Sequence, residues 1–191
     1  MQYLSTTKHF ALTFSRGSDD CAVTTFYGTC DAAHNATHDA KGITGWAYLL
    51  CGAAISWKCR AQPITALSST EAELIAIDDA IRELRYLHKL LEKFGQQVRT
   101  PTWIGQDNMS TIAIIGNGKF SARNKHVALR YHHVGDLVIA GQVQMSYLPT
   151  GQMTEDLLKK GMTAEVHELH RAVIMGHRPL QPGPDGGPAT E

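Results

Sequence analysis

The sequence lacks a long apolar run, an excess of charge of one sign and a signal peptide. A membrane-spanning helix needs about 18 or more consecutive apolar residues, and no run approaches that length, so no membrane partner is expected. The first residues, MQYLSTTKHF, do not show the charged-then-apolar order of a secretory signal, which favours an intracellular protein. The formal net charge is +0, which argues against a strongly basic nucleic-acid-binding surface but leaves room for a local patch.

Closely spaced cysteines are also absent. Cys21, Cys30, Cys51 and Cys59 form no C-x-x-C pair, so neither a structural zinc site nor a redox motif is indicated, and reduced thiols are expected. What the chain does contain is enough apolar sequence for a real core: 43% of its 191 residues are hydrophobic. One domain with extra terminal segments is therefore predicted.

The apolar and β-branched patterns predict the element order β-β-β-α-β-α-α-β-α, an α/β domain with a mixed sheet. The predicted strands lie at 22–30, at 43–60 (two strands that meet near Cys51), at 101–107 and at 142–149. The predicted helices lie at 66–94, 108–115, 124–141 and 152–160. A terminal helix is possible at 162–177, and the Pro- and Gly-rich end, 178–191, is expected to be disordered.

Two glutamates stand at the start of the long predicted helix, in ALSSTEAELIAIDDAI. Ser68 and Glu71 fit the capping box S-x-x-E, which gives Glu71 a structural role. At about 100° per residue, Glu73 lies within roughly 40° of the apolar stripe of this helix, and Glu71 points about 160° away. A carboxylate on a buried face needs a partner, such as a Lys, an Arg or a metal ion. Alternatively, the first turn lies at a wet rim, where Glu73 only favours the positive helix terminus.

Three further acids are placed at element ends. Asp31 follows the first predicted strand, Asp107 follows TWIGQ, and Asp156 falls near the start of the last predicted helix. Each alone has an ordinary explanation, since Asp is common in turns and at helix starts. If they converge with Glu73, hard oxygen ligands of this kind would hold Mg²⁺ or Mn²⁺. Convergence is an expectation that only a structure can test.

Several motifs resemble a known family. YGTCDAAHNA, ISWKCRAQPITALSSTEAELIA, QDNMSTIAI, ARNKHVALRYHHV and YLPTGQMTEDLLKK follow one another in the order and at the spacing of the ribonuclease H domain of copia-type LTR retrotransposon polyproteins. Together they cover about residues 26–160. The run around Glu73 is the most specific, because it is long. The leading segment, 1–21, resembles the connection that follows reverse transcriptase in these polyproteins, and 22–161 would be the ribonuclease H domain.

The resemblance implies a ribonuclease H-like fold, in which helices flank a five-stranded mixed sheet. It implies hydrolysis of the RNA strand of an RNA/DNA hybrid with two Mg²⁺ (or Mn²⁺) ions, held by Asp31, Glu73, Asp107 and Asp156 as ligands. It also implies a reverse transcriptase domain of the same polyprotein as partner and no small-molecule cofactor. The location would be the cytoplasm, in a virus-like particle, or the nucleus.

Basic side chains are the candidates for contacts to the hybrid. Lys58 and Arg60 alternate to one face of the third strand, and a second group precedes the later helix: Arg123, Lys125 and His126. The ordinary alternative for each is a solvated surface charge.

The chain departs from the family pattern at several positions. It has QDN for C-D-N and TEDLLKK for A-D-I-L-T-K, so Glu155 competes with Asp156 for the place of the fourth ligand. These departures leave open an inactive or domesticated remnant that at most binds nucleic acid. An integrase-type nuclease is ranked last, because that class takes its glutamate from a later helix.

Overall fold

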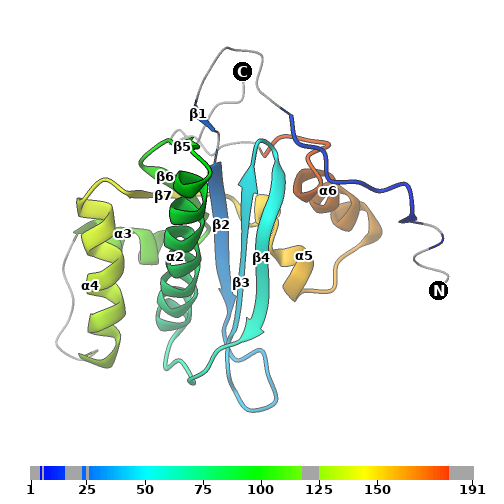
Figure 1. Cartoon of the computed structure of the whole chain (residues 1–191). Coiled ribbons are helices and arrows are strands. Elements are labelled where there is room, and N and C mark those ends of the chain that lie inside the picture. The colour runs from blue at the N-terminus through cyan, green and yellow to red at the C-terminus, as the bar shows by residue number, and fades with distance from the viewer. Residues whose placement is uncertain (1–4, 6, 16–22, 25, 118–124, 181–191) are drawn as a thin grey trace.

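A five-stranded mixed sheet forms the centre of the computed structural model, which describes residues 5, 7–15, 23–24, 26–117 and 125–180 (Figure 1). Its strand order is β4-β3-β2-β6-β7. The bounds are β2 (Phe26–Ala33), β3 (Ile43–Leu50), β4 (Ala53–Ala61), β6 (Thr102–Gln106) and β7 (Val143–Tyr147). β3 is antiparallel to both β2 and β4, whereas β6 is parallel to β2 and β7. The predicted five-stranded mixed sheet is confirmed.

Helices cover both faces of this sheet (Figure 1). On one face lie α2 (Ser69–Lys93), α3 (Met109–Asn117) and α4 (Lys125–Ile139). On the other face lie α5 (Asp156–Lys159) and α6 (Ala164–Ile174), and a short 3-10 helix, η2 (Thr150–Gln152), follows β7. No helix among the described residues is long and apolar enough to cross a membrane.

Each face of the sheet has its own apolar core. The larger core lies under α2, and it contains four residues of the apolar stripe that the sequence predicted for this helix: Ile77, Ala80, Leu84 and Leu87. The fifth, Leu91, is buried as well. Phe26, Cys30 and Trp46 meet it from the sheet. The smaller core lies on the α6 face and joins Tyr27 and Trp103 to Leu148. Alternate residues of β2 therefore enter different cores, as the period of a strand requires.

The first predicted strand, 22–30, is wrong in its bounds. Val23–Thr24 form a separate strand, β1, which pairs in parallel with β5 (Gln97–Val98). The sheet strand β2 begins at Phe26 and continues to Ala33, because its pairing with β3 extends to Ile43. Asp31 thus lies inside β2 rather than after it. Asp and Ala are poor strand formers, so the local pattern ended the strand too early.

The segments before and after the sheet pack against each other. Thr13 N–H donates a hydrogen bond to the carbonyl of Met175, at 2.8 Å, and the guanidinium of Arg171 lies 3.7 Å from the ring centre of Phe10. Leu180 is buried in the smaller core, although 178–191 was predicted to be disordered. Apolar burial therefore fixes the first part of that segment, and 181–191 lie outside the described residues.

Candidate metal centre

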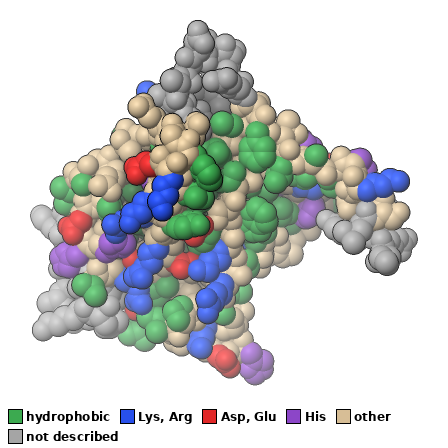
Figure 2. Space-filling view, in the orientation of Figure 1, with side chains coloured by type: hydrophobic (Ala, Val, Ile, Leu, Met, Phe, Trp, Pro, Cys, Tyr) green, Lys and Arg blue, Asp and Glu red, His purple; other side chains and the backbone are tan. Residues whose placement is uncertain are grey.

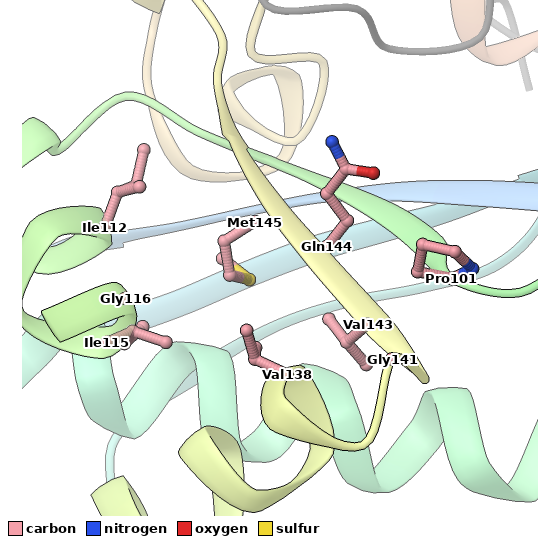
Figure 3. Close-up of a pocket in the computed structure, with 9 residues that line it drawn as sticks. All are labelled: Pro101, Ile112, Ile115, Gly116, Val138, Gly141, Val143, Gln144 and Met145. Atoms are coloured by element: carbon pink, nitrogen blue, oxygen red, sulfur yellow. The ribbon is translucent and has the colours of Figure 1, made fainter. Parts of the chain in front are cut away.

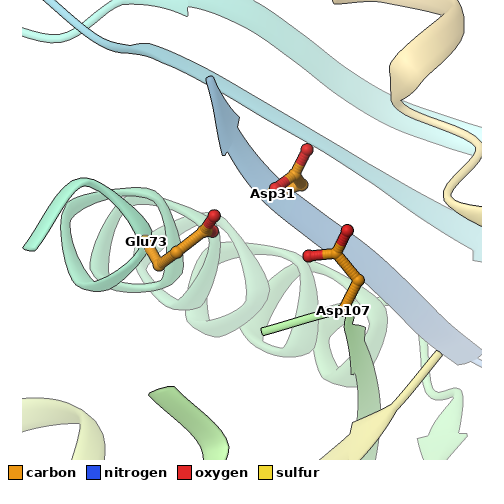
Figure 4. Close-up of side chains that lie close together, drawn as sticks. All are labelled: Asp31, Glu73 and Asp107. Carbon is orange, nitrogen blue, oxygen red and sulfur yellow. The ribbon is translucent and has the colours of Figure 1, made fainter. Parts of the chain in front are cut away.

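Three carboxyl groups meet at one end of the sheet (Figure 4). Asp31 comes from β2, Glu73 from α2, and Asp107 follows β6 directly; one carboxylate oxygen of each lies within 4.8 Å of the others. Hydrogen-bonded pairing between β2 and β6 ends at Thr29 and Gly105, so these acids stand just beyond the point where the two parallel strands part. Ligand sites of α/β sheets lie at such strand ends. The structure thus brings together three of the four predicted acids.

Glu73 is held in this group by hydrogen bonds to its Oε2. The backbone N–H of Ala32 donates at 3.0 Å, and the side-chain Nε2 of Gln106 donates at 2.9 Å. The carbonyl oxygen of the Gln106 side chain in turn accepts from the backbone N–H of Asp107 at 2.7 Å. Glu73 is buried, so the expectation of a core position is confirmed and the wet-rim alternative is wrong.

Glu71 has the structural role that the capping box predicted. Its backbone N–H donates to Ser68 Oγ at 3.1 Å, and its carboxylate accepts from the backbone N–H of Leu67 at 2.8 Å. The carboxylate reaches one residue beyond the cap. Glu71 therefore stabilises the start of α2, whereas Glu73, two residues later, belongs to the group of three acids.

Crowding of the three acids changes their protonation. Burial, and then the charge of Asp31, raise the pKa of Glu73 to about 9. Burial and the same charge also raise the pKa of Asp107. Burial would raise the pKa of Asp31 too, but the adjacent Lys159 ammonium outweighs it and lowers that pKa. At neutral pH the three carboxylates are therefore not all ionised at once unless a further positive charge binds beside them.

The fourth predicted acid, Asp156, stands at the first position of α5 and is paired with lysines. Its carboxylate lies 3.2 Å from Lys159 Nζ and 2.9 Å from Lys160 Nζ. Lys159 also forms a short ion pair with Asp31, and Lys160 lies 3.6 Å from the same carboxylate. Two ammonium groups therefore connect Asp156 to Asp31, and Asp156 is outside the group of three close acids.

Glu155, the alternative fourth ligand, faces a different environment. It is fully buried, and its Oε2 accepts a hydrogen bond from Thr29 Oγ1 at 2.5 Å. Burial raises its pKa to about 8 against the opposing effect of Lys159. Its other oxygen has no hydrogen-bond partner within the described parts of the chain. The contact with Thr29 holds the Glu155 carboxylate apart from the three close acids.

Two residues of this region were missed by the sequence interpretation: Gln106 and Lys159. Gln106 appeared only as a departure from a cysteine in the family pattern, and Lys159 as a departure from a threonine. The signal for Gln106 was its position beside Asp107 at the end of a buried strand. No local signal pointed to Lys159, because its contact with Asp31 spans 128 residues of chain.

The predicted hybrid-binding residues fall into three groups. Lys58 Nζ lies 2.8 Å from Asp79 on α2, so its charge is already paired. Arg60 is exposed, and no ion pair joins it to the described residues. Lys125 and His126 begin α4, but their side chains, like all of Arg123, lie outside the described residues. Figure 2 shows Lys and Arg side chains gathered on the face that α2 covers, with acidic side chains between them.

A pocket of about 280 Å³ lies elsewhere, between α3, α4 and β7 (Figure 3). Its lining is mainly apolar, with Ile112, Ile115 and Val138 on the helices and Val143 and Met145 on the strand. None of the four acids lines it. It is therefore not part of the candidate site.

The acid group fits a divalent ion by the chemistry of its donors. Mg²⁺ and Mn²⁺ prefer hard oxygen ligands, and Asp31, Glu73 and Asp107 offer carboxylate oxygens close enough to share one ion. Burial, and then the charge of Asp31, disfavour the ionised form of Glu73, and this raises its pKa. A cation bound at this point would favour the ionised form of Glu73 and offset the charge of Asp31.

Comparison with known proteins places this geometry in context. No protein-family model matches the chain. It is 30% identical, over 72% of its length, to the retrovirus-related Pol polyprotein from transposon TNT 1-94 of Nicotiana tabacum, and 31% identical, over 66% of its length, to that of transposon RE2 of Arabidopsis thaliana. The chain spans only 10% and 9% of the length of these two relatives.

Solved structures with a similar arrangement include two ribonucleases H. One is RNase H1 from Halobacterium salinarum NRC-1, with a TM-score of 0.48 and 11% identity, covering 68% of this chain and 89% of that one. The other is LC11-RNase H1 isolated from compost, with a TM-score of 0.48 and 13% identity, covering 70% and 91%. The sequence relatives confirm the resemblance that the motifs indicated: the chain belongs with the retrovirus-related Pol polyproteins of copia-type transposons, as the counterpart of one short segment.

Proposed function

We propose that the chain is a divalent-metal-dependent ribonuclease H that hydrolyses the RNA strand of RNA/DNA hybrids during reverse transcription of a retrotransposon. One observation carries the proposal: Asp31, Glu73 and Asp107 present carboxylate oxygens within 4.8 Å of one another. The matching segment of Pol polyproteins and the family motifs around these residues support the choice of substrate.

The chain's own residues would position the ions and the substrate. Asp31, Glu73 and Asp107 would hold one ion, and Asp156 would complete the site for a second. When bound, paired ions activate water and stabilise the leaving oxygen in phosphodiester hydrolysis. Gln106 fixes the orientation of Glu73, and Thr150 Oγ1, which donates to Asp107 Oδ2 at 2.9 Å, fixes that of Asp107. A reverse transcriptase domain of the same polyprotein would be the partner, inside the cell.

Cleavage of a labelled RNA/DNA hybrid in Mg²⁺ or Mn²⁺ tests the proposal. We expect the chain to cut the RNA strand and to leave RNA duplex and DNA duplex intact. Asp31→Asn and Glu73→Gln should abolish cutting. Glu71→Gln is the matched control, because it changes a carboxylate on the same helix that serves the cap. A folded chain that cuts no hybrid with either ion would refute the proposal.

A specific observation also supports the remnant as a second candidate. Lys159 and Lys160 pair with Asp31 and Asp156 and thereby neutralise part of the acid centre. A non-catalytic chain of this kind would bind hybrid without cutting it. Fluorescence anisotropy with a labelled hybrid, run beside the cleavage assay, separates binding with cleavage from binding alone.

A further inference from the structure

Lys159 lies beside the acid group, and its charged side chain is completely buried. Its side chain is 0% exposed, whereas that of the adjacent Lys160 is 44% exposed. A buried ammonium is retained only with close negative partners. Lys159 has two: a short ion pair with Asp31 and a contact of 3.2 Å with Asp156.

The sheet makes room for the stem of this lysine. Gly45 on β3 pairs in register with Asp31, so the two residues face the same side of the sheet. A Cβ added at Gly45 would lie 2.5 Å from Cδ of Lys159. The aliphatic part of Lys159 therefore crosses β3 in close contact with a glycine, and this path directs the ammonium to Asp31.

The position of this ammonium conflicts with a second divalent ion. Asp31 belongs to the group of three close acids, and it also contacts Lys159. Lys159 in turn contacts Asp156. A cation between Asp31 and Asp156 would have to displace Lys159 Nζ or lie beside it, and like charges at that separation repel. An ion held by the group of three acids, on the side of Glu73 and Asp107, would not have to displace Lys159.

We propose that Lys159 acts as a built-in counter-cation that occupies the Asp31–Asp156 side of the centre, so that the chain alone binds one divalent ion at Asp31, Glu73 and Asp107 and takes a second only when Lys159 is displaced. The inference rests on the proposed function in one respect, namely that the acids are cation ligands. It makes Lys159 a positioning residue that sets metal occupancy.

Titration of the metal-free chain with Mn²⁺, followed by calorimetry and by the electron paramagnetic resonance signal of free Mn²⁺, measures stoichiometry and affinity directly. We expect one ion for the unchanged chain. Lys159→Met, which keeps the stem and removes the charge, should bind a second ion or bind Mn²⁺ at least about tenfold more tightly. Lys160→Met is the matched control and should change affinity much less, since its ammonium is partly in water.

A second measurement links the effect to Asp156. Adding Asp156→Asn should change Mn²⁺ binding little in the unchanged chain but should remove the gain seen in Lys159→Met. Lys159→Gln serves the same purpose if Lys159→Met does not fold, because its amide can still donate to Asp31. Thermal melting reports folding, and Mn²⁺ should raise the melting temperature more in the Lys159 variants than in the unchanged chain.

Two outcomes would overturn the inference: two ions bound by the unchanged chain, or equal stoichiometry and affinity in Lys159→Met. Neither depends on catalysis. Failure of the proposed function would look different, since the chain would bind Mn²⁺ and still leave the hybrid uncut at saturating metal.

Discussion

Gln106 donates a hydrogen bond from its side-chain amide to Glu73, 2.9 Å away, and accepts one from the backbone N–H of Asp107 with the same amide group. One side chain thus connects two acids that come from different elements, a helix and a strand end. The connection is enclosed, because Gln106 is fully buried. It fixes the orientation of the Glu73 carboxylate.

We therefore expect Gln106→Ala to weaken Mn²⁺ binding by roughly ten- to a hundredfold, the usual cost of losing a group that orients a ligand. Calorimetric titration measures this directly. Gln144→Ala, at an exposed position of β7, is the matched control and should bind as the unchanged chain does. Equal affinities in the two variants would show that Gln106 does not orient Glu73.

The two neighbouring acids of α5 should differ in their effect on cleavage. Asp156→Asn should lower the rate of hybrid cleavage at saturating Mn²⁺ by at least about tenfold, as expected when a metal ligand is lost. Glu155→Gln should leave the rate nearly unchanged, since Glu155 contacts Thr29 and stands apart from the three close acids. A larger loss in Glu155→Gln would assign the fourth ligand to Glu155.

Arg60 and Lys58 should contribute differently to hybrid binding. Arg60→Ala should weaken binding, because the exposed guanidinium is free to contact a phosphate. It should also reduce the slope of log affinity against log salt concentration by the amount that about one phosphate contact contributes. Lys58→Ala should have little effect, since Asp79 already holds that ammonium. Anisotropy titrations over a series of salt concentrations test both. If Lys58→Ala weakens binding as much, the ion pair must open when the hybrid binds.

The cap of α2 should contribute to stability without affecting the metal. Ser68→Ala removes the acceptor of the Glu71 N–H bond and should lower the free energy of unfolding by about 1 kcal/mol. Ser69→Ala, one position into the helix, should have a smaller effect. Denaturant unfolding measures both, and Mn²⁺ affinity should stay constant. A loss of affinity in Ser68→Ala would mean that the cap also positions Glu73.

His88 should make folding stability depend on pH. Burial lowers its pKa below the ordinary 6.5, against the opposing charge of Glu92, and its Nε2 lies 2.8 Å from Thr102 Oγ1. His88 therefore binds a proton more readily in the unfolded chain than in the folded one. Its contribution to the free energy of unfolding is complete above about pH 6.5 and is lost as the pH falls toward the lower pKa of the folded state. His88→Gln should flatten part of the decline in unfolding free energy below neutral pH.

Urea unfolding at several pH values between about 5 and 7.5 measures this difference. Some decline should remain in His88→Gln, because burial also lowers the pKa of His170. A pH profile that His88→Gln leaves unchanged would contradict the assignment.

Local chemistry was sufficient to predict much of the site. The capping box and the apolar stripe separated Glu71 from Glu73, because both depend on residues within one helix. Asp107 followed from the end of a buried strand. The bounds of β2 did not follow, since its last residues are strand only through pairing with β3.

The interactions that the sequence could not predict are tertiary. Lys58 was a candidate for substrate contact or else a solvated surface charge, and its pairing with Asp79 depends on how α2 lies across the sheet. The contact of Lys159 with Asp31 joins positions 128 residues apart, and only the packing of α5 against β3 makes it possible. Patterns along the chain contain no information on such pairs.

The four acids are contributed in chain order by β2, α2, the end of β6 and α5. A coding sequence interrupted by a stop codon between the codons for Asp107 and Asp156 would still specify the three close acids, but it would lose the fourth acid together with the lysine that neutralises it. Such a shortened product would also lack β7 if the stop fell before residue 143, and with it one edge of the sheet. In a retrotransposon copy that accumulates mutations, the reading frame must therefore stay uninterrupted through the codons of α5 if the product is to contain all four acids.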